Sequence, residues 1–518
     1  MIGIFLRNLN FRISLTYLTV LATLSVFFLY FAQFDTTQIG GRIFLHVADD
    51  HMITMRVAKN FADYGVPFFN HDEAVAANTS LFWPLILGAT IMTFSITEAV
   101  ALNILMSVFL SAMTIAIATL WFKEWWLRLS AIILLAGSAT YLKFGASGWE
   151  HIPQAFFVTL GFYFIYKSSV DKLIIPTFAV FLISFSFIFR PDSAVIIAFT
   201  VLAWVLHNDN YKRWKIYPYS LLLLVLPISY LILMNHYYDS FLPNTSKLKI
   251  LDLQQSLEFG IMYVINPIKS GLAPLLLLIL FFIKSKGHFS RFVLFIGCMH
   301  FSYVVLIGGD VFSFGRFFIL LLPTLVFVTL YEIDKLYLSN KEFLKTSLLS
   351  VIVLVTIAGN YEFILTDTLL ANRDSNEVEQ IRVVRNVSER LEPSDGSIGM
   401  HYLGISYHIP EFHVVDFLGK AEPNIASMQP KYGGIGHNKW DYQYAFERYN
   451  IAVVPMQDRT VLEVSSPQFK LTQRNLSFSQ ECVQFIQNSD AYVYLPSEYF
   501  GNSVYGAFVR RDLSEKFQ

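Results

Sequence analysis

Two adjacent carboxylates, Asp49 and Asp50, follow the first long apolar stretch of the chain. The segment that they begin returns to an apolar run at Phe82-Trp83-Pro84. Neighbouring aspartates can bind a divalent cation such as Mg²⁺ or Mn²⁺, or supply a general base and an electrostatic partner. An Asp-Asp pair also occurs in ordinary solvated turns, so the spacing alone leaves both interpretations open.

The composition indicates an integral membrane protein. Hydrophobic residues make up 54% of the 518 positions and charged residues only 15%, whereas about a quarter of a soluble protein is charged. The net charge of −1 gives no reason to expect a nucleic-acid partner. Cys298 lies in an apolar run and Cys482 in the polar C-terminal part, so we expect no disulfide between them.

The first apolar run, Ile13 to Phe34, follows Arg7 and Arg12. It is long enough to cross about 30 Å of hydrocarbon as a helix. A signal peptide would have a shorter apolar core and a small-residue cleavage site, but this run ends Phe31-Ala32-Gln33-Phe34-Asp35. We therefore expect an uncleaved span with a cytoplasmic N-terminus.

The remaining topology follows from hydropathy and from basic loops, which favour the cytoplasmic side. The further apolar runs are roughly 80–97, 99–122, 128–146, 152–167, 173–189, 191–207, 217–235, 267–284, 290–308, 316–333 and 346–365. The basic loops contain Lys123 and Arg128; Lys167 and Lys172; Lys212, Arg213 and Lys215; Lys284, Lys286 and Arg291; and Lys335, Lys341 and Lys345. The N-terminus lies on the same side of the membrane as these basic loops only if one of the early apolar runs does not cross the membrane. The run 80–97 is short and carries Pro84 and Gly88, so we expect an interfacial or re-entrant helix and about eleven true spans.

This topology places charged residues in several turns of the outer face, where charges near the membrane are usually paired or functional. They are Asp49, Asp50, Arg56, Glu150, Arg190, Asp192, Lys247, Lys249, Asp310 and Arg316. Interhelical ion pairs are one explanation. The other is a site in which carboxylates deprotonate a hydroxyl or hold a metal while Arg and Lys bind a phosphate leaving group. Sugar transfer from a lipid-linked phosphate needs both kinds of group at a membrane surface.

The chain from residue 366 onward has no long apolar run, unlike the part before it. An amphipathic helix is predicted from Glu377 to Leu391. Short strands are predicted at Ser397 to His401, Phe412 to Val415, Ile451 to Pro455 and Ala491 to Leu495. We expect two domains, a transmembrane domain over 1–365 and a small α/β domain over 366–518 that follows the last span to the outer side.

Several blocks, in order, resemble the bacterial GT-C glycosyltransferases similar to the mycobacterial terminal β-1,2-arabinofuranosyltransferase. The blocks are Ala48-Asp49-Asp50-His51 with Arg56 and Asn60; Asn78-Thr79-Ser80-Leu81-Phe82-Trp83; Ser147-Gly148-Trp149-Glu150; Arg190-Pro191-Asp192; Leu242-Pro243-Asn244-Thr245 with Lys249; Gly308-Gly309-Asp310 with Arg316-Phe317; Asp416-Phe417-Leu418-Gly419 with Pro423; and Gly436-His437-Asn438-Lys439. Leu81-Phe82 stands where the family has Pro-Leu, and Trp149 where it has Leu. These departures bear on substrate identity rather than on the chemistry.

The resemblance implies a mainly α, polytopic GT-C membrane fold with a juxtamembrane helix and a C-terminal periplasmic α/β domain, in a bacterial inner membrane. It implies a polyprenyl-phosphate sugar donor, arabinofuranose in the best-known members, and a glycan, lipid or protein acceptor on the periplasmic side. Asp49 and Asp50 would be the catalytic pair, with Mg²⁺ or Mn²⁺ as a candidate ligand. The donor would contact Arg56, Glu150, Arg190, Asn244, Lys249, Asp310 and Arg316, and His437 would face the acceptor.

Two alternatives remain open from the sequence. A transporter or flippase of lipid-linked sugars would favour internal repeats and charges near the bilayer midplane, whereas here the charges gather at outer helix ends and no repeat is visible. A ligase that moves a sugar onto a protein would share the fold and differ only in its acceptor. His437 in its loop is also compatible with simple solvation.

Overall fold

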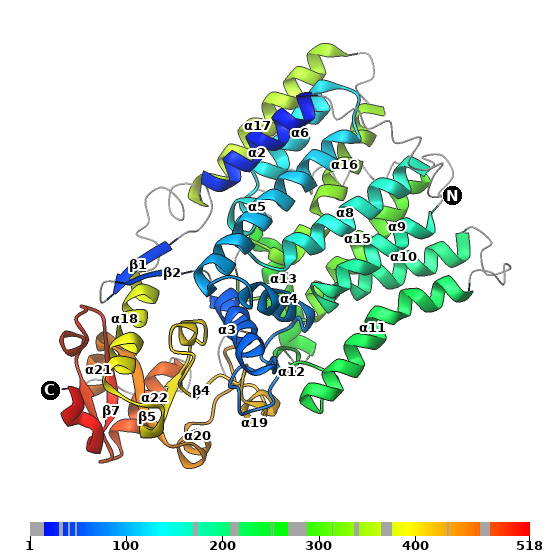
Figure 1. Cartoon of the computed structure of the whole chain (residues 1–518). Helices are drawn as coiled ribbons and strands as arrows, with labels where there is room; N and C mark the ends of the chain where they lie inside the picture. The colour runs from blue at the N-terminus through cyan, green and yellow to red at the C-terminus, as the bar shows by residue number, and fades with distance from the viewer. Residues whose placement is uncertain are drawn as a thin grey trace.

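The computed structural model is mainly helical and describes residues 15–30, 35–39, 42–46, 49–168, 175–207, 217–249, 251, 253–267, 287–312, 314–335, 341–363, 375–431, 435–466 and 477–517. The predicted span 267–284, the flanking Arg7 and Arg12, and the loop residues Lys172, Lys212, Arg213, Lys215, Lys284 and Lys286 lie, nearly or wholly, outside the described residues. In Figure 1 the helices from α2 to α17 form an elongated bundle, and the C-terminal region from α18 to β7 lies at one end of it.

The apolar runs fold as helices because a helix satisfies its backbone hydrogen bonds without water. The bundle helices are α2 (Leu15–Tyr30), α5 (Ile96–Leu120), α6 (Trp125–Ala136), α7 (Ala139–Phe144), α8 (His151–Ser168), α9 (Thr177–Phe185), α10 (Ala194–His207), α11 (Tyr217–Tyr238), α13 (Leu253–Pro267), α15 (His288–Leu306), α16 (Leu322–Ile333) and α17 (Glu342–Phe363). Within the described residues, three helical stretches are long and apolar enough to cross a membrane: Ile96–Leu120, His288–Leu306 and Glu342–Asn360. Other apolar helices are shorter, such as Trp125–Ala136 and Leu322–Ile333.

Two helices lie at the junction of the bundle and the C-terminal region. Helix α3 (Asp49–Tyr64) begins with the two aspartates, whose charges suit the positive end of a helix dipole. Helix α4 (Phe82–Ile91) packs on α3 and has 10 residues, about 15 Å in length, which is too short to cross a membrane. Helices α6 and α16, which were predicted to span, are also short, so the number of spans stays a prediction. A short helix, α12 (Asn244–Leu248), lies beside α19 (Pro423–Ser427) of the C-terminal region.

The C-terminal region is built on a five-stranded mixed sheet with the order β4-β3-β5-β7-β6. Its strands are β3 (Ser397–Met400), β4 (Val414–Asp416), β5 (Ile451–Gln457), β6 (Tyr492–Leu495) and β7 (Tyr505–Arg510), and its other helices are α18 (Ser375–Arg390), α20 (Tyr442–Arg448), α21 (Asp458–Ser465) and α22 (Phe478–Gln487). Strand β3 pairs in parallel with β4 and β5, while β7 pairs antiparallel with β5 and β6. The amphipathic helix and four strands were predicted; β7 and the hairpin of β1 (Asp35–Ile39) and β2 (Arg42–His46) were not.

Helix α3 shares a hydrophobic core with the C-terminal region. Ile53 and Val57 of α3 are buried in the same cluster as Ile381, Val384 and Ile398. The opposite face of α3 packs into the bundle core through Met52 and Met55. Helix α3 is thus held on both sides, and its N-terminal carboxylates are fixed at the boundary between the two regions.

Candidate active site

The two aspartates begin a row of side chains with alternating charge. Lys420 Nζ lies 3.6 Å from Asp49 Oδ2 and 2.9 Å from Asp50 Oδ1. The other oxygen of Asp50 accepts a hydrogen bond of 2.9 Å from Arg316 Nη1. Arg316 Nε donates to Asp310, whose second oxygen lies 3.7 Å from Lys249 Nζ. The row therefore reads Asp49, Lys420, Asp50, Arg316, Asp310, Lys249, with three carboxylates balanced by three cations.

The carboxyl group of Asp50 is held in its charged form by this arrangement. Burial by itself raises its pKa, but the Lys420 ammonium and the Arg316 guanidinium outweigh burial and hold the pKa far below its usual range. The same contacts raise the pKa of Lys420 despite its burial. Asp50 and Lys420 are therefore ionised together at neutral pH, and both Asp50 oxygens are already engaged.

Asp49 is held more loosely than Asp50. Its Oδ1 accepts a 2.7 Å hydrogen bond from the backbone N–H of Gly404. Within the described residues, its Oδ2 has only the long contact to Lys420. A Cβ atom on residue 404 would lie 2.6 Å from Asp49 Oδ1, so glycine is required for this close approach. Asp49 is thus oriented by one hydrogen bond and keeps an oxygen available to a ligand.

Lys420 reaches the aspartates from a turn of the C-terminal region. The buried carboxylate of Asp416 accepts hydrogen bonds from the backbone N–H groups of Leu418 (2.8 Å) and Ala421 (2.7 Å), which closes the turn around Lys420. The block Asp416 to Gly419 resembled the family in the sequence, yet Lys420 itself was not predicted as a site residue. The signal was its position directly after that block, and nothing in the sequence indicated which residue it faces.

Arg316 and Lys249 gather around aromatic rings. The Arg316 guanidinium carbon lies 4.8 Å from the ring centroid of Trp149 and 4.4 Å from that of Phe312. Lys249 Nζ lies 4.8 Å from the centroid of Phe317. Such rings stabilise cations in a desolvated site. The tryptophan that departs from the family pattern therefore stacks on an arginine of the site.

The guanidinium carbon of Arg190 lies over the same Phe317 ring, 5.6 Å from its centroid. Its guanidinium binds Glu150 Oε1 at 2.8 Å and Asp192 Oδ2 at 2.9 Å. The predicted residues Glu150 and Arg190 thus come together as an ion pair next to the charged row. Both ring nitrogens of His151, which lies against Phe317 at 6.3 Å between centroids, are buried without a hydrogen-bond partner within the described structure. Polar atoms left in this state commonly bind water or a ligand.

A cavity of about 570 Å³ opens beside these cations. Arg190, Asp192 and Lys249 line one part of it. Apolar side chains line much of the rest, among them Phe187, Pro227, Leu231, Phe241, Leu306 and Ile307. Among the described residues Lys249 makes two loose polar contacts, 3.4 Å to the carbonyl of Gly309 and 3.7 Å to Asp310, besides the ring of Phe317. An ammonium group has three donors. The cavity thus combines charged side chains, among which the Lys249 ammonium has an N–H left for a ligand, with a largely apolar lining.

A second, smaller cavity of about 250 Å³ lies on the Asp49 side of the row. It is lined by Asp49 together with residues of α18 and of the C-terminal sheet, including Gln380, Tyr402, Gln457 and Tyr505. His437 lies close to its rim, with its ring centroid 6.4 Å from that of Tyr402. Burial lowers the pKa of His437, and the nearby Lys420 lowers it further. His437 is therefore a neutral polar group near the aspartates.

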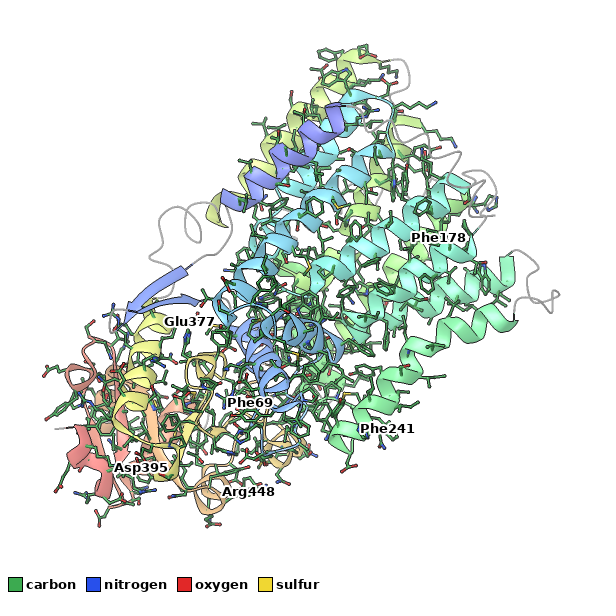
Figure 2. The ribbon with its side chains drawn as sticks, in the orientation of Figure 1. Phe69, Phe178, Phe241, Glu377, Asp395 and Arg448 are labelled. Carbon is green, nitrogen blue, oxygen red and sulfur yellow. The ribbon has the colours of Figure 1, made fainter. Side chains whose placement is uncertain are left out.

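Two predicted site residues have other surroundings. The buried guanidinium of Arg56 donates to the carbonyls of Phe69, Ser406, Ile409 and Phe412 and to the side chain of Asn70. Its hydrogen-bonding capacity is used in joining α3 to the C-terminal region (Figure 2 shows Phe69 at this junction), which does not favour the predicted contact with a donor. Asn244 begins α12 and is buried, and its Nδ2 has no partner within the described residues.

The oxygen atoms of Asp49 and Asp50 are poorly placed to act as ligands of the predicted metal ion. Both oxygens of Asp50 accept from protein cations, and one oxygen of Asp49 accepts from a backbone N–H. A divalent cation would need several oxygen ligands. Among the residues that the structure describes, no group of three or more His, Cys, Asp or Glu side chains is placed to hold a metal ion. Lys420 and Arg316 occupy the positions around Asp50 that a metal would need.

Comparison with solved structures finds similar membrane proteins. The apo crystal structure of ArnT from Cupriavidus metallidurans is similar to this chain with a TM-score of 0.56 and 11% identity, over 95% of this chain and 97% of that one. The structure of the same protein bound to undecaprenyl phosphate gives 0.55 and 10%, over 96% and 98%. The oligosaccharyltransferase of Archaeoglobus fulgidus, in complex with Zn and sulfate, gives 0.48 and 12%, over 92% and 71%. No protein-family model matches, and no curated protein sequence does. The chain therefore has the GT-C membrane fold of ArnT.

Proposed function

We propose that this protein is a glycosyltransferase that takes a sugar from a polyprenyl-phosphate donor and transfers it to an acceptor at the membrane surface. The observation that carries the proposal is the larger cavity. Lys249 and Arg190 line it together with many apolar side chains, and Lys249 belongs to the charged row. An anionic head group attached to a long hydrocarbon chain has the matching distribution of charge and apolar surface. The similarity to ArnT, solved with undecaprenyl phosphate, supports the same class of donor.

In the proposed reaction Asp49 acts as the general base. Its carboxylate takes the proton of an acceptor hydroxyl while that oxygen forms a bond to the anomeric carbon of the sugar. The bond between the anomeric carbon and the phosphate oxygen breaks, and its electron pair stays on the polyprenyl phosphate. Lys249 stabilises this leaving group, because an ammonium near phosphate offsets developing charge. Asp50 is a weaker candidate for the base, since both its oxygens already accept from Arg316 and Lys420.

The finer identity of the substrates rests on the sequence resemblance. We propose arabinofuranose as the sugar and a bacterial inner membrane as the location, with the site and residues 366–518 on the periplasmic side. The acceptor would be a glycan, a lipid or a protein on that side. The predicted Mg²⁺ or Mn²⁺ has no step in this proposal, because protein cations surround Asp50.

A transfer assay tests the proposal directly. Purified full-length protein in nanodiscs would be incubated with a panel of polyprenyl-phosphate sugars and a mixture of envelope glycans, and free polyprenyl phosphate would be measured. We expect one donor to be consumed by the wild type, and at least about 10²-fold more slowly by Asp49→Asn. A transporter or flippase would instead move the donor between leaflets of a vesicle without consuming it, and that result would refute the proposed function.

A further inference from the structure

The smaller cavity differs from the donor cavity in both charge and polarity. Among its described lining residues the only ionisable acids are Asp49 and Glu377, and neither lysine nor arginine is among them. His401 also lines it, and burial lowers the pKa of this histidine to about 3, so that its ring is neutral. The larger cavity, by contrast, presents the two cations Arg190 and Lys249 together with one acid, Asp192. Lys420 contacts Asp49 but is not among the residues that line the smaller cavity. An anion is therefore better placed in the larger cavity, where two cations face one acid, than in the smaller one.

The polar groups of the smaller cavity are arranged around one hydroxyl. Gln380 of α18 and Gln457 of β5 both donate from Nε2 to the Tyr505 hydroxyl, at 2.6 and 2.7 Å. A phenol oxygen that accepts two hydrogen bonds still has its own proton to donate, and each amide keeps a carbonyl oxygen as an acceptor. The three side chains thus form a fixed set of donor and acceptor positions, which suits a ligand rich in hydroxyl groups.

Two further features fit a sugar ring. Tyr402 lines the cavity and is 45% exposed, so its ring can cover one face of a bound sugar. The volume of about 250 Å³ lies just below the usual range for ligand sites, roughly 300–1,000 Å³, and so admits one small polar unit. Figure 2 shows Glu377 on α18 at the side of the C-terminal region that faces the helical bundle.

We propose that this cavity, formed by Asp49, Glu377, Gln380, Tyr402, Gln457 and Tyr505, is the acceptor site and that it takes the end of a neutral, hydroxyl-rich glycan rather than a phosphorylated acceptor. The proposal rests on the proposed function and narrows the acceptor class. Among the described lining residues, Asp49 alone also belongs to the charged row. A sugar hydroxyl bound here lies beside the carboxylate that is proposed to deprotonate it.

Direct binding tests the acceptor class without any donor. Full-length protein in nanodiscs would be applied to an array of neutral pentose and hexose oligosaccharides together with their phosphate-ester counterparts. We expect a neutral oligosaccharide to bind, and its phosphate ester to bind at least about 10-fold more weakly. Tyr505→Phe should weaken binding of that oligosaccharide by about 2- to 12-fold, the effect of losing one neutral hydrogen bond. Tyr499→Phe, an exposed tyrosine outside the cavity, is the matched control and should leave binding unchanged.

A charge variant provides an independent check. Glu377→Gln removes one of the two acids and should reduce the discrimination against phosphate esters at least about 3-fold. Glu389→Gln, on the same helix but about 18 Å further along, should not change it. Equal or tighter binding of the phosphate esters to the wild type, unchanged neutral-glycan binding in Tyr505→Phe, or no glycan binding at all would each overturn the inference. Continued consumption of a lipid-phosphate donor in those cases would leave the proposed function intact, whereas loss of donor consumption in wild type would count against the function itself.

Discussion

Lys420 Nζ lies 2.9 Å from Asp50 Oδ1, although the two residues are 370 positions apart in the chain. The contact joins the first turn of α3 to a turn of the C-terminal region. It places a positive charge between Asp50 and Asp49, which would otherwise be two neighbouring like charges. The C-terminal region is therefore part of the site rather than an appendage of the bundle.

Replacing Lys420 by Met should destabilise the protein by about 1.5–3 kcal/mol at neutral pH, the range for a hydrogen bond to a charged group. The pKa of Asp50 is held below its ordinary value of 3.8 in the folded protein, so its contribution is fully present above about pH 4 and is lost as the pH falls through the folded pKa. The gap in unfolding temperature between wild type and variant should therefore stay constant from pH 7 down to about pH 4 and begin to narrow only at lower pH. Thermal unfolding in nanodiscs across that range measures it. Lys420→Arg keeps the charge and serves as control; a gap independent of pH would contradict the assignment.

The two aspartates should respond differently to a nearly isosteric change. Asp49→Asn should reduce transfer by at least about 10²-fold with donor affinity and unfolding temperature nearly unchanged, because a base is lost while Lys420 keeps its closer partner Asp50. Asp50→Asn should reduce transfer and also lower the unfolding temperature, because it leaves Lys420 and Arg316 without their shared anion. Asp63→Asn, on the same helix and in an exposed pair with Lys59, is the control. Near-normal transfer in both site variants would mean that the active site lies elsewhere.

Lys249→Ala should weaken binding of a polyprenyl-phosphate donor by about 1.5–3 kcal/mol, or roughly 13- to 160-fold in Kd. The reason is that Lys249 has the loosest contacts in the charged row and lines the apolar cavity. Binding to the protein in nanodiscs, measured with a fluorescent short-chain polyprenyl phosphate, gives the ratio. The neighbouring Lys247→Ala should bind like wild type, since Lys247 is not among the residues that line the cavity. If Lys249→Ala binds the lipid normally, the cavity is not the phosphate site.

Arg316→Ala should have a mixed effect. Its guanidinium neutralises both Asp50 and Asp310 and stacks on Trp149 and Phe312. Removing it leaves two carboxylates with less compensation, so we expect a lower unfolding temperature together with weaker donor binding. Measuring both quantities on one preparation distinguishes this from Lys249→Ala, which should lower donor affinity alone. A stable Arg316→Ala protein with normal donor affinity would argue against both roles.

Arg56→Ala should destabilise the contact between α3 and the C-terminal region by at least about 3 kcal/mol, because several hydrogen bonds to buried carbonyls are lost together. Arg56→Lys should recover little, since an ammonium lacks the planar set of donors that reaches these carbonyls. Limited proteolysis and unfolding temperature report the effect. Lys59→Ala, which breaks an exposed pair with Asp63, should change stability by less than about 1 kcal/mol. Wild-type resistance to protease in Arg56→Ala would refute its joining role.

The proposed orientation predicts which surfaces an external reagent reaches. Cys298 is exposed and would first be replaced by Ser, while Cys482 is buried. A cysteine at Ser394, on the exposed surface of the C-terminal region, should then be labelled from the outside in intact cells. A cysteine at Lys123, in an exposed loop at the end of α5, should be labelled only after permeabilisation. The reverse pattern would invert the topology.

The sequence by itself determined the architecture. Long apolar runs have one stable solution in lipid, the helix, and the alternation of a helix and short strands after residue 366 indicated a mixed α/β region. It also selected most of the residues that meet, because charged side chains at outer helix ends are rare enough to be noticed. Asp49, Asp50, Lys249, Asp310 and Arg316, together with Lys420, lie in one row of contacts; that this row is the active site stays a prediction. Strand β7 escaped prediction because Tyr505–Arg510 has no clear alternation of buried and exposed positions, and five of its six residues are buried.

Only the tertiary structure decided which charges pair and which are free. Pair formation depends on distances between residues far apart in the chain, which spacing cannot supply. Arg56 looked like a ligand contact in the sequence, yet it is directed at carbonyls of residues about 350 positions away. Lys420 went unnoticed because a lysine in a polar region carries no signal until a turn held by Asp416 brings it between two aspartates. The smaller cavity forms where α18, β5 and β7 meet Asp49, and no single segment of the sequence contains enough of its lining to be recognised.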